Sequence, residues 1–160
     1  MHIVLIEPEI PGNTGNIARL CAATNIELHL VKPLGFSTDD KYLKRAGLDY
    51  WHLVKVHYHE SFDEVLAMYK NHQFYYSSTK APRSYTEVSF GEDDMLVFGK
   101  ETAGIPETIL KEHWDTCIRI PMLSDARSLN LSNSVAIVAY EAMRQLDFNH
   151  LKQVGFDHLD

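Results

Sequence analysis

Three short segments of the sequence combine glycine with polar side chains of the kind that hold phosphate or hydroxyl groups. The first spans residues 11–19 (PGNTGNIAR) and contains Asn16 and Arg19, three positions apart. On a helix this spacing places both side chains on one face. The free N–H groups of a helix N-terminus also favour anionic ligands. Asn13 and Thr14 are interpreted as caps of that helix. The segment therefore predicts a phosphate- or hydroxyl-binding position at Asn16 and Arg19.

Two later segments have the same character. Residues 98–106 (FGKETAGIP) form a polar stretch bracketed by glycines, and residues 120–136 combine IPML with SLNLSNSVA. Taken singly, the first is a loop between a strand and a helix, and the second is explained in part by a helix cap at Ser132 or Asn133. The number of Asn and Ser side chains in the last segment exceeds what one cap requires. The order and spacing of all three segments favour one shared site.

Several common site chemistries are missing from the sequence. Gly99-Lys100 is followed by Glu101 and does not complete a Walker A loop, and no third glycine completes a dinucleotide fingerprint at residues 12–15. The motifs H-E-x-x-H, C-x-x-C and G-x-S-x-G do not occur. His57 and His59 alternate along an expected strand and are interpreted as a surface pair, not as metal ligands.

The elements that must position these segments alternate along the chain. Strands are expected at 2–7, 27–32, 53–57, 73–78, 95–99 and 117–120. Helices are expected at 13–24, from 39 or 40 to 47, at 61–70, from 106, and at 132–146. This order predicts a single α/β domain over residues 1–160, with a mostly parallel sheet of about six strands and helices on both faces. Such sheets bind ligands beyond the carboxyl ends of their strands.

Composition agrees with a globular chain. Of the 160 residues, 45% are hydrophobic and 23% charged, and the formal net charge is -7. The acidic total counts against a nucleic-acid coat protein or a polybasic membrane binder, but it allows a local basic patch for RNA. Cys21 is expected to be a buried thiol. The sequence shows neither a leader pattern nor an apolar run of about 18 residues. A cytoplasmic location away from membranes is therefore expected.

The three segments together resemble the three motifs of the SPOUT superfamily. The matching residues are 13–16 with Arg19, then 99–101 with Gly104, and then 120–122 with 128–133. More narrowly, residues 2 to about 147 resemble the SpoU-type RNA 2′-O-methyltransferases, and among them those acting on the wobble nucleotide of tRNA. The resemblance implies a deep trefoil knot in the C-terminal part of the sheet, and a homodimer.

The resemblance also implies a cofactor and a set of site residues. S-adenosylmethionine (AdoMet) is the expected methyl donor and S-adenosylhomocysteine the product, with no metal. Arg19 is expected to bind the target phosphate and stabilise the alkoxide, while Asn16 and Asn130 orient the hydroxyl and Glu101 joins the loops or holds Arg19. Cofactor contacts are expected at Ser77, Ser78, Thr79, Gly99, Lys100, Gly104, Ile120, Pro121, Met122, Ser128, Leu129 and Asn130.

The implied substrate is the anticodon arm of a tRNA, a leucine tRNA in particular. Its wobble cytidine or uridine would be methylated on the ribose 2′-hydroxyl. Lys41, Lys44 and Arg45 on the short helix, together with Arg127 beside the pocket, are the expected contacts to the RNA. Three alternatives stay open: an enzyme of the same fold acting on ribosomal RNA, a non-catalytic AdoMet-binding RNA-assembly protein, and a nucleotide-binding α/β regulator.

Overall fold

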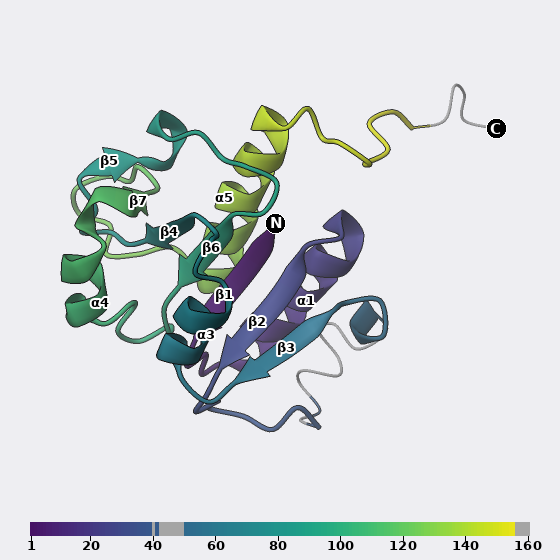
Figure 1. Cartoon of the computed structure of the whole chain (residues 1–160), viewed down its shortest axis with the longest axis horizontal. Helices are drawn as coiled ribbons and strands as arrows, with labels where there is room; N and C mark the ends of the chain where they lie inside the picture. The colour runs from purple at the N-terminus through teal and green to yellow at the C-terminus, as the bar shows by residue number, and fades with distance from the viewer. Residues whose placement is uncertain (40, 42–49, 156–160) are drawn as a thin grey trace.

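The computed structural model describes residues 1–39, 41 and 50–155, and within them seven parallel strands form one sheet. The strand order is β3-β2-β1-β6-β4-β7-β5 (Figure 1). The predicted parallel α/β architecture is confirmed, and the sheet has seven strands where about six were expected. The additional strand, β5, has two residues and is too short to show alternation in sequence. The strands are β1 (His2–Ile6), β2 (Glu27–Val31), β3 (Val56–His59), β4 (Phe74–Ser77), β5 (Arg83–Ser84), β6 (Met95–Phe98) and β7 (Cys117–Arg119).

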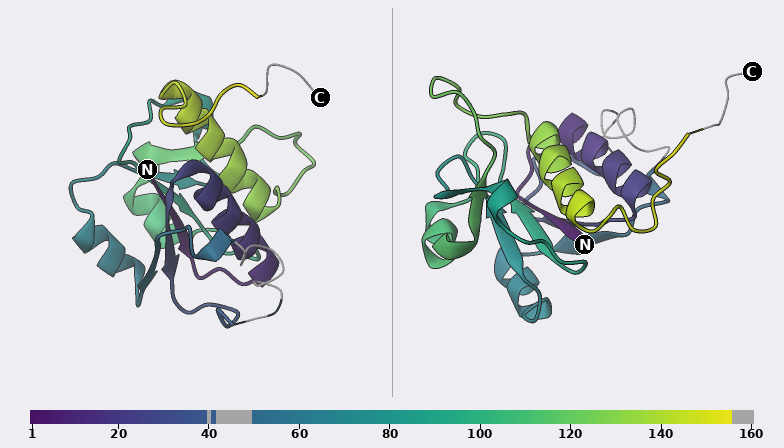
Figure 2. Two further views of the ribbon diagram at one scale, coloured as in Figure 1. Left: turned by 90° about the vertical axis from the view of Figure 1, so that its right-hand side faces the viewer. Right: turned by 90° about the horizontal axis from the view of Figure 1, so that it is seen from above.

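Helices cover both faces of the sheet. Two of them pack side by side on one face, and the two others lie on the opposite face (Figure 2). Strand side chains alternate between these faces, so that Ile3 and Leu5 join one apolar cluster while Val4 and Ile6 join the other. Cys21 is 1% exposed, as predicted. The helices are α1 (Pro11–Thr24) and α5 (Leu131–Gln145) on the first face, and α3 (Phe62–Met68) and α4 (Glu107–Glu112) on the second.

One element differs in position from the sequence-based expectation, and another lies mostly outside the described part. Strand β3 begins at Val56 and not at residue 53, because residues 50–54 complete helical turns, with the N–H of Leu53 bonded to the carbonyl of Tyr50. The helix expected from 39 or 40 to 47 lies almost wholly outside the described residues. None of the described helices is long and apolar enough to cross a membrane.

Two predicted helix caps are wrong. Helix α1 begins at Pro11, with Ile10 as a cap that makes no side-chain hydrogen bond. Asn13 therefore lies inside the helix, where its side chain is available for other contacts. Helix α5 is capped by Asn130, whose side-chain oxygen accepts hydrogen bonds from the N–H groups of Ser132 and Asn133. Proline at the first helical position and an Asn two residues upstream of the expected cap explain both shifts.

Histidines occupy the face of the sheet that α3 covers. His29 of β2 is fully buried and bridges two neighbouring strands, with 3.0 Å from its Nε2 to Nδ1 of His2 and 3.0 Å from its Nδ1 to Nε2 of His59. The surface interpretation of His59 is wrong, since only 2% of the residue is exposed. Burial lowers the pKa of His2 to about 4 and that of His29 to about 3, because it disfavours the charged ring.

This histidine pair should make the fold sensitive to mild acid. Both pKa values lie below the ordinary value of 6.5, so the unfolded chain binds more protons than the folded one between pH 6.5 and 4. The stabilisation is complete above pH 6.5 and is lost as the pH falls through that window. The free energy of unfolding should drop by at least about 1 kcal/mol between pH 7 and pH 5. Urea unfolding at several pH values in metal-free buffer measures this free energy. If a His2→Gln variant lost as much stability between pH 7 and pH 5, the drop could not be attributed to His2.

Candidate active site

A cavity of about 820 Å³ opens beyond the carboxyl ends of β4, β6 and β7. Its size is that of a site for a nucleoside-sized ligand, and its place is the edge where parallel sheets bind ligands. Apart from Pro121, every residue expected to contact a cofactor lies in its lining, and Arg127 lines it as well. The predicted residues in the lining are Ser77, Ser78, Thr79, Gly99, Lys100, Gly104, Ile120, Met122, Ser128, Leu129 and Asn130.

A chain of hydrogen bonds joins the three polar segments at the cavity. The carboxylate of Glu101 accepts from the N–H of Glu9 at 2.7 Å, the N–H of Ile10 at 3.0 Å and Nδ2 of Asn13 at 3.2 Å. Oδ1 of Asn13 in turn accepts from Nδ2 of Asn130 at 3.0 Å. Asn130 then caps α5. Asn13 thus bridges residues that are far from it and from each other in sequence.

The loop after β6 is held in shape by glycine. Gly104 has a φ of +69°, and its N–H bonds to the carbonyl of Lys100 at 2.8 Å. A Cβ on Gly99 would come within 1.9 Å of the backbone of Gly104, so a side chain at that position is excluded. Two further contacts fix the loop to the end of β1. Nζ of Lys100 lies 2.9 Å from a carboxylate oxygen of Glu7. Thr102 donates to the carboxylate of Glu9 through its N–H and its hydroxyl.

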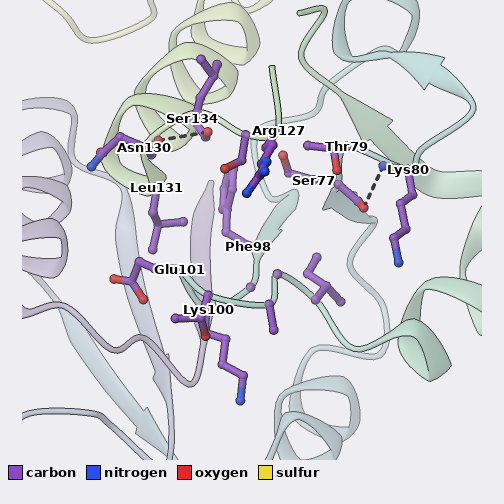
Figure 3. Close-up of a pocket in the computed structure, with 18 of the residues that line it drawn as sticks. Ser77, Thr79, Lys80, Phe98, Lys100, Glu101, Arg127, Asn130, Leu131 and Ser134 are labelled. Carbon is purple, nitrogen blue, oxygen red and sulfur yellow. Dashed lines mark hydrogen bonds between the residues drawn. The ribbon is translucent and has the colours of Figure 1, made fainter. Parts of the chain in front are cut away.

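The lining combines apolar and cationic side chains. Asn130 and Leu131 at the start of α5 lie on one side of the cavity and Thr79 and Lys80 on the other, with Arg127 between them (Figure 3). Lys80 pairs with the carboxylate of Glu107. Within the described part of the chain, Arg127 forms no ion pair, so its charge is available to a ligand. Sequence reasoning missed some of the lining, chiefly apolar side chains within or beside the polar segments, namely Ile10, Phe98, Ile105, Leu110 and Leu131.

Asn16 and Arg19 lie beside this cavity and not in it. They line a second, shallower depression between α1 and α5 together with Ser132 and Asn133. The helix geometry explains the separation. Arg19 is six residues beyond Asn13, which at about 100° per residue turns it roughly 120° around the helix from the buried Asn13. The guanidinium of Arg19 lies 4.9 Å from the centre of the Tyr50 ring.

The geometry also bears on the expected roles of the other polar residues. The contacts of Glu101 with residues 9, 10 and 13 agree with the expectation that it joins the loops. Asn130 has its oxygen occupied by the N-terminus of α5 and one amide hydrogen by Asn13, so it positions the segments and has one N–H left for a ligand. Of the basic residues expected to contact RNA, Lys41 is exposed, and Lys44 and Arg45 lie outside the described residues.

Residues 1–140 match the model of the SpoU rRNA methylase family. With most of its length matched, the chain belongs to this family. One relative is the tRNA (cytidine(34)-2'-O)-methyltransferase of Saccharophagus degradans, which is 51% identical over 148 residues, covering 92% of this chain and 96% of the relative.

Solved structures agree with the family assignment. A structure concerned with the 2-OH methylation of C/U34 on tRNA has a TM-score of 0.87 and 44% sequence identity, and the match covers 91% of this chain and 95% of that one. The SpoU methyltransferase AviRb from Streptomyces viridochromogenes, solved in complex with the cofactor AdoMet, has a TM-score of 0.80 at 23% identity, over 92% of this chain and 58% of its own. The second comparison shows a shared fold.

Removing the carboxylate of Glu101 should loosen the site. In a Glu101→Ala variant the N–H groups of residues 9 and 10 and the amide of Asn13 lose their common acceptor. The free energy of unfolding should fall by about 1 kcal/mol or more, because the partly buried donors of Glu9 and Asn13 are left without their acceptor. Urea denaturation measures this loss. The control is Asp115→Ala, which removes an exposed acidic side chain in a 3-10 turn. Equal losses in the two variants would contradict a joining role for Glu101.

Proposed function

We propose that this chain transfers a methyl group from AdoMet to the ribose 2′-hydroxyl of the wobble cytidine or uridine of tRNA, acting as a single domain in the cytoplasm, where tRNA is modified. The observation that carries the proposal is the joining of three motif segments around one cavity by Glu101, Asn13 and Asn130. Membership of the SpoU family and the wobble-specific relative of nearly equal length support the same reaction.

The residues that line the cavity fit AdoMet. Bound AdoMet supplies a methyl group already activated on a sulfonium. Ile120, Met122 and Leu129 offer apolar walls for a flat base, and Gly99 lets the loop that lines the cavity pack closely on itself. The polar loops at residues 77–79 and 128–130 offer hydrogen-bonding groups around these walls. These residues bind and orient the donor and exclude water from it.

Arg19 acts on the RNA in this proposal. A guanidinium has a pKa above about 12 and is a poor base, but it suits a phosphate and a developing alkoxide. In one chain Arg19 borders the depression next to the cavity, and Ser132 and Asn133 line the same depression. A homodimer that packs across α1 and α5 brings Arg19 and Asn16 of one copy toward the cavity of the other. The exposed Tyr140 on α5, 47% accessible, supports such an interface.

The proposed contact surface for tRNA is local. Arg127 and Lys100 lie at the cavity, and Lys41 is exposed. With Lys44 and Arg45, which lie outside the described residues, they are the proposed source of positive charge for RNA on an acidic protein. Contacts of this kind bind phosphates and weaken as salt rises.

The trefoil knot belongs to the same proposal. Strands β4 and β5 follow one another with only residues 78–82 between them, yet β7 lies between the two in the sheet. The connection therefore crosses β7, and the N–H of Ser78 bonds to the carbonyl of Ile118 at 2.9 Å. Beyond β7 the chain returns to α5, which packs on α1 and β6. Such a crossing supports threading of the C-terminal part through this loop.

The reaction is tested by mapping the methyl group. Purified protein, isotope-labelled AdoMet and tRNA from cells lacking the activity should give label on nucleotide 34, located by mass spectrometry of nuclease fragments. Ribosomal RNA from the same cells is the matched substrate control. Label found only in ribosomal RNA would establish the alternative substrate, and absence of label from both would contradict an RNA methyltransferase.

The role of Arg19 has its own test. An Arg19→Ala variant should lose methyl transfer by about 100-fold or more, the usual effect of removing one group that stabilises an oxyanion. Binding of AdoMet, measured by calorimetry, should remain close to that of the unchanged protein. Lys111→Ala, an exposed basic residue on α4, is the control and should keep full activity. Parallel loss of AdoMet binding and activity in Arg19→Ala would contradict a role on the RNA.

A further inference from the structure

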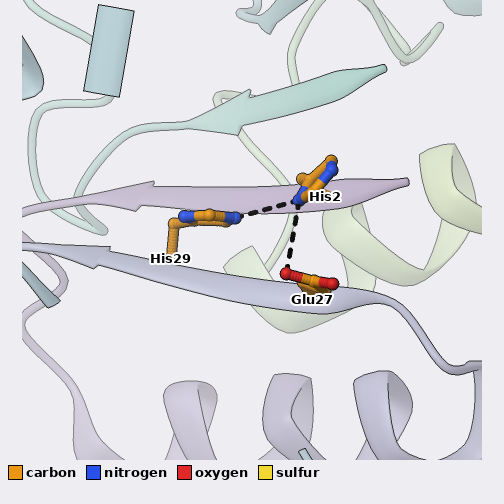
Figure 4. A group of neighbouring side chains, drawn as sticks. All are labelled: His2, Glu27 and His29. Carbon is orange, nitrogen blue, oxygen red and sulfur yellow. Dashed lines mark hydrogen bonds and ion pairs between the residues drawn. The ribbon is translucent and has the colours of Figure 1, made fainter. Parts of the chain in front are cut away.

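A second group of chemically active side chains lies at the amino-terminal end of the sheet. His2 begins β1 and pairs in register with Glu27 at the start of β2, and His29 follows two residues later on the same face of the sheet (Figure 4). The cavity described above lies at the opposite, carboxyl end of the strands. The methyl-transfer proposal makes no use of these three residues.

The three side chains are spaced as ligands of one ion. One nitrogen or oxygen atom from each lies within 4.8 Å of the others. Nδ1 of His2 is 3.0 Å from Nε2 of His29 and 3.9 Å from Oε2 of Glu27. Ligands at about 2.0–2.1 Å from a tetrahedral zinc ion lie about 3.3 Å apart. Small rotations of the rings are therefore enough to admit an ion between these atoms.

The proton positions around His29 leave a lone pair pointing into this space. Nδ1 of His59 is buried and lies 4.0 Å from the carboxylate of Glu64, with no hydrogen-bond partner among the described residues. A proton on that nitrogen is favoured, because a lone pair there would face a negative charge. Nε2 of His59 then accepts from Nδ1 of His29. Since a neutral ring has one proton, Nε2 of His29 is unprotonated and faces His2.

The surrounding contacts resemble the outer contacts of a metal site. A ligating histidine commonly donates its second ring N–H to a fixed acceptor, as His29 does to His59. The carboxylate of Glu27 is held by Nζ of Lys55 at 3.0 Å and by Nε2 of His57 at 2.8 Å. His29 is fully buried, while 27% of the Glu27 side chain is exposed, which gives an ion a path from solvent.

We propose that His2, Glu27 and His29 bind one divalent transition-metal ion of the zinc class, with a water in the fourth position. Two imidazoles and one carboxylate suit zinc or cobalt and not magnesium or calcium, which prefer oxygen ligands. On binding, the proton on Nδ1 of His2 passes to solvent and Nε2 of the same ring takes up one from solvent, so the ring stays neutral with no net proton change. The ion cross-links β1 and β2 near their amino-terminal ends and takes no part in methyl transfer.

Calorimetric titration of the chelator-treated full chain, without an affinity tag, tests the site directly. Zn²⁺ should bind with one-to-one stoichiometry, and Co²⁺ should give the visible absorption of a tetrahedral site. Glu27→Gln and His2→Gln should each weaken Zn²⁺ binding at least about tenfold. His52→Gln, which removes an exposed histidine outside the cluster, should bind Zn²⁺ like the unchanged chain.

Two further measurements distinguish a loss of zinc binding from a loss of folding and from an effect on methyl transfer. Circular dichroism of the metal-free variants establishes that they are folded, and Zn²⁺ should raise the melting temperature of the unchanged chain and of His52→Gln but not of Glu27→Gln. Methyl transfer, measured as above, should be the same with and without chelator. Absence of saturable Zn²⁺ binding, or full binding by folded Glu27→Gln and His2→Gln, would overturn the proposal.

Discussion

The arrangement of the cavity depends on one carboxylate. Glu101 lies in a loop without regular secondary structure, and so do residues 9 and 10, whose N–H groups have no strand or helix partner to bond. Backbone donors that lose water need an acceptor, and an ionised acceptor gives the stronger, shorter bond. By accepting from this loop and from Asn13, Glu101 fixes the end of β1 against the loop after β6. Asn13 extends the same constraint to Asn130 and the start of α5.

The parallel sheet separates two polar ends by an apolar middle. All strands run in one direction, so their carboxyl ends gather the loops that line the cavity, and their amino ends gather His2 and Glu27. On the face that carries the histidines, Val4 and Val31 belong to the apolar cluster that also contains Val65 of α3. Histidines on this face are fixed by the register of three adjacent strands. The two ends can therefore differ in chemistry without sharing a side chain.

Local sequence patterns were enough to predict the fold. The partners of individual side chains could not be predicted, because they depend on the order of the strands in the sheet. Short β-branched runs and alternating helices were enough for a parallel α/β sheet, and glycine with Asn and Ser marked the cavity loops. The burial of His59 could not be predicted from its own strand, because His29 and the residues of α3 that cover it come from elsewhere in the chain. The two-residue β5 was missed because its pairing with β7 depends on an element about 35 residues away.

Asn13 and Arg19 show what residue spacing predicts on a helix and what it does not. Both lie on one helix and in one motif, and the sequence places Arg19 on the same side as Asn16. Burial of Asn13 against Glu101 and Asn130 then fixes the rotation of α1, and this rotation directs Asn16 and Arg19 toward the surface shared with α5. A helix held from its buried side in this way cannot turn its outer residues into its own cavity. The same hydrogen bonds that assemble the cavity in one chain thus leave the arginine facing outward, where a second copy of the chain or the RNA itself can meet it.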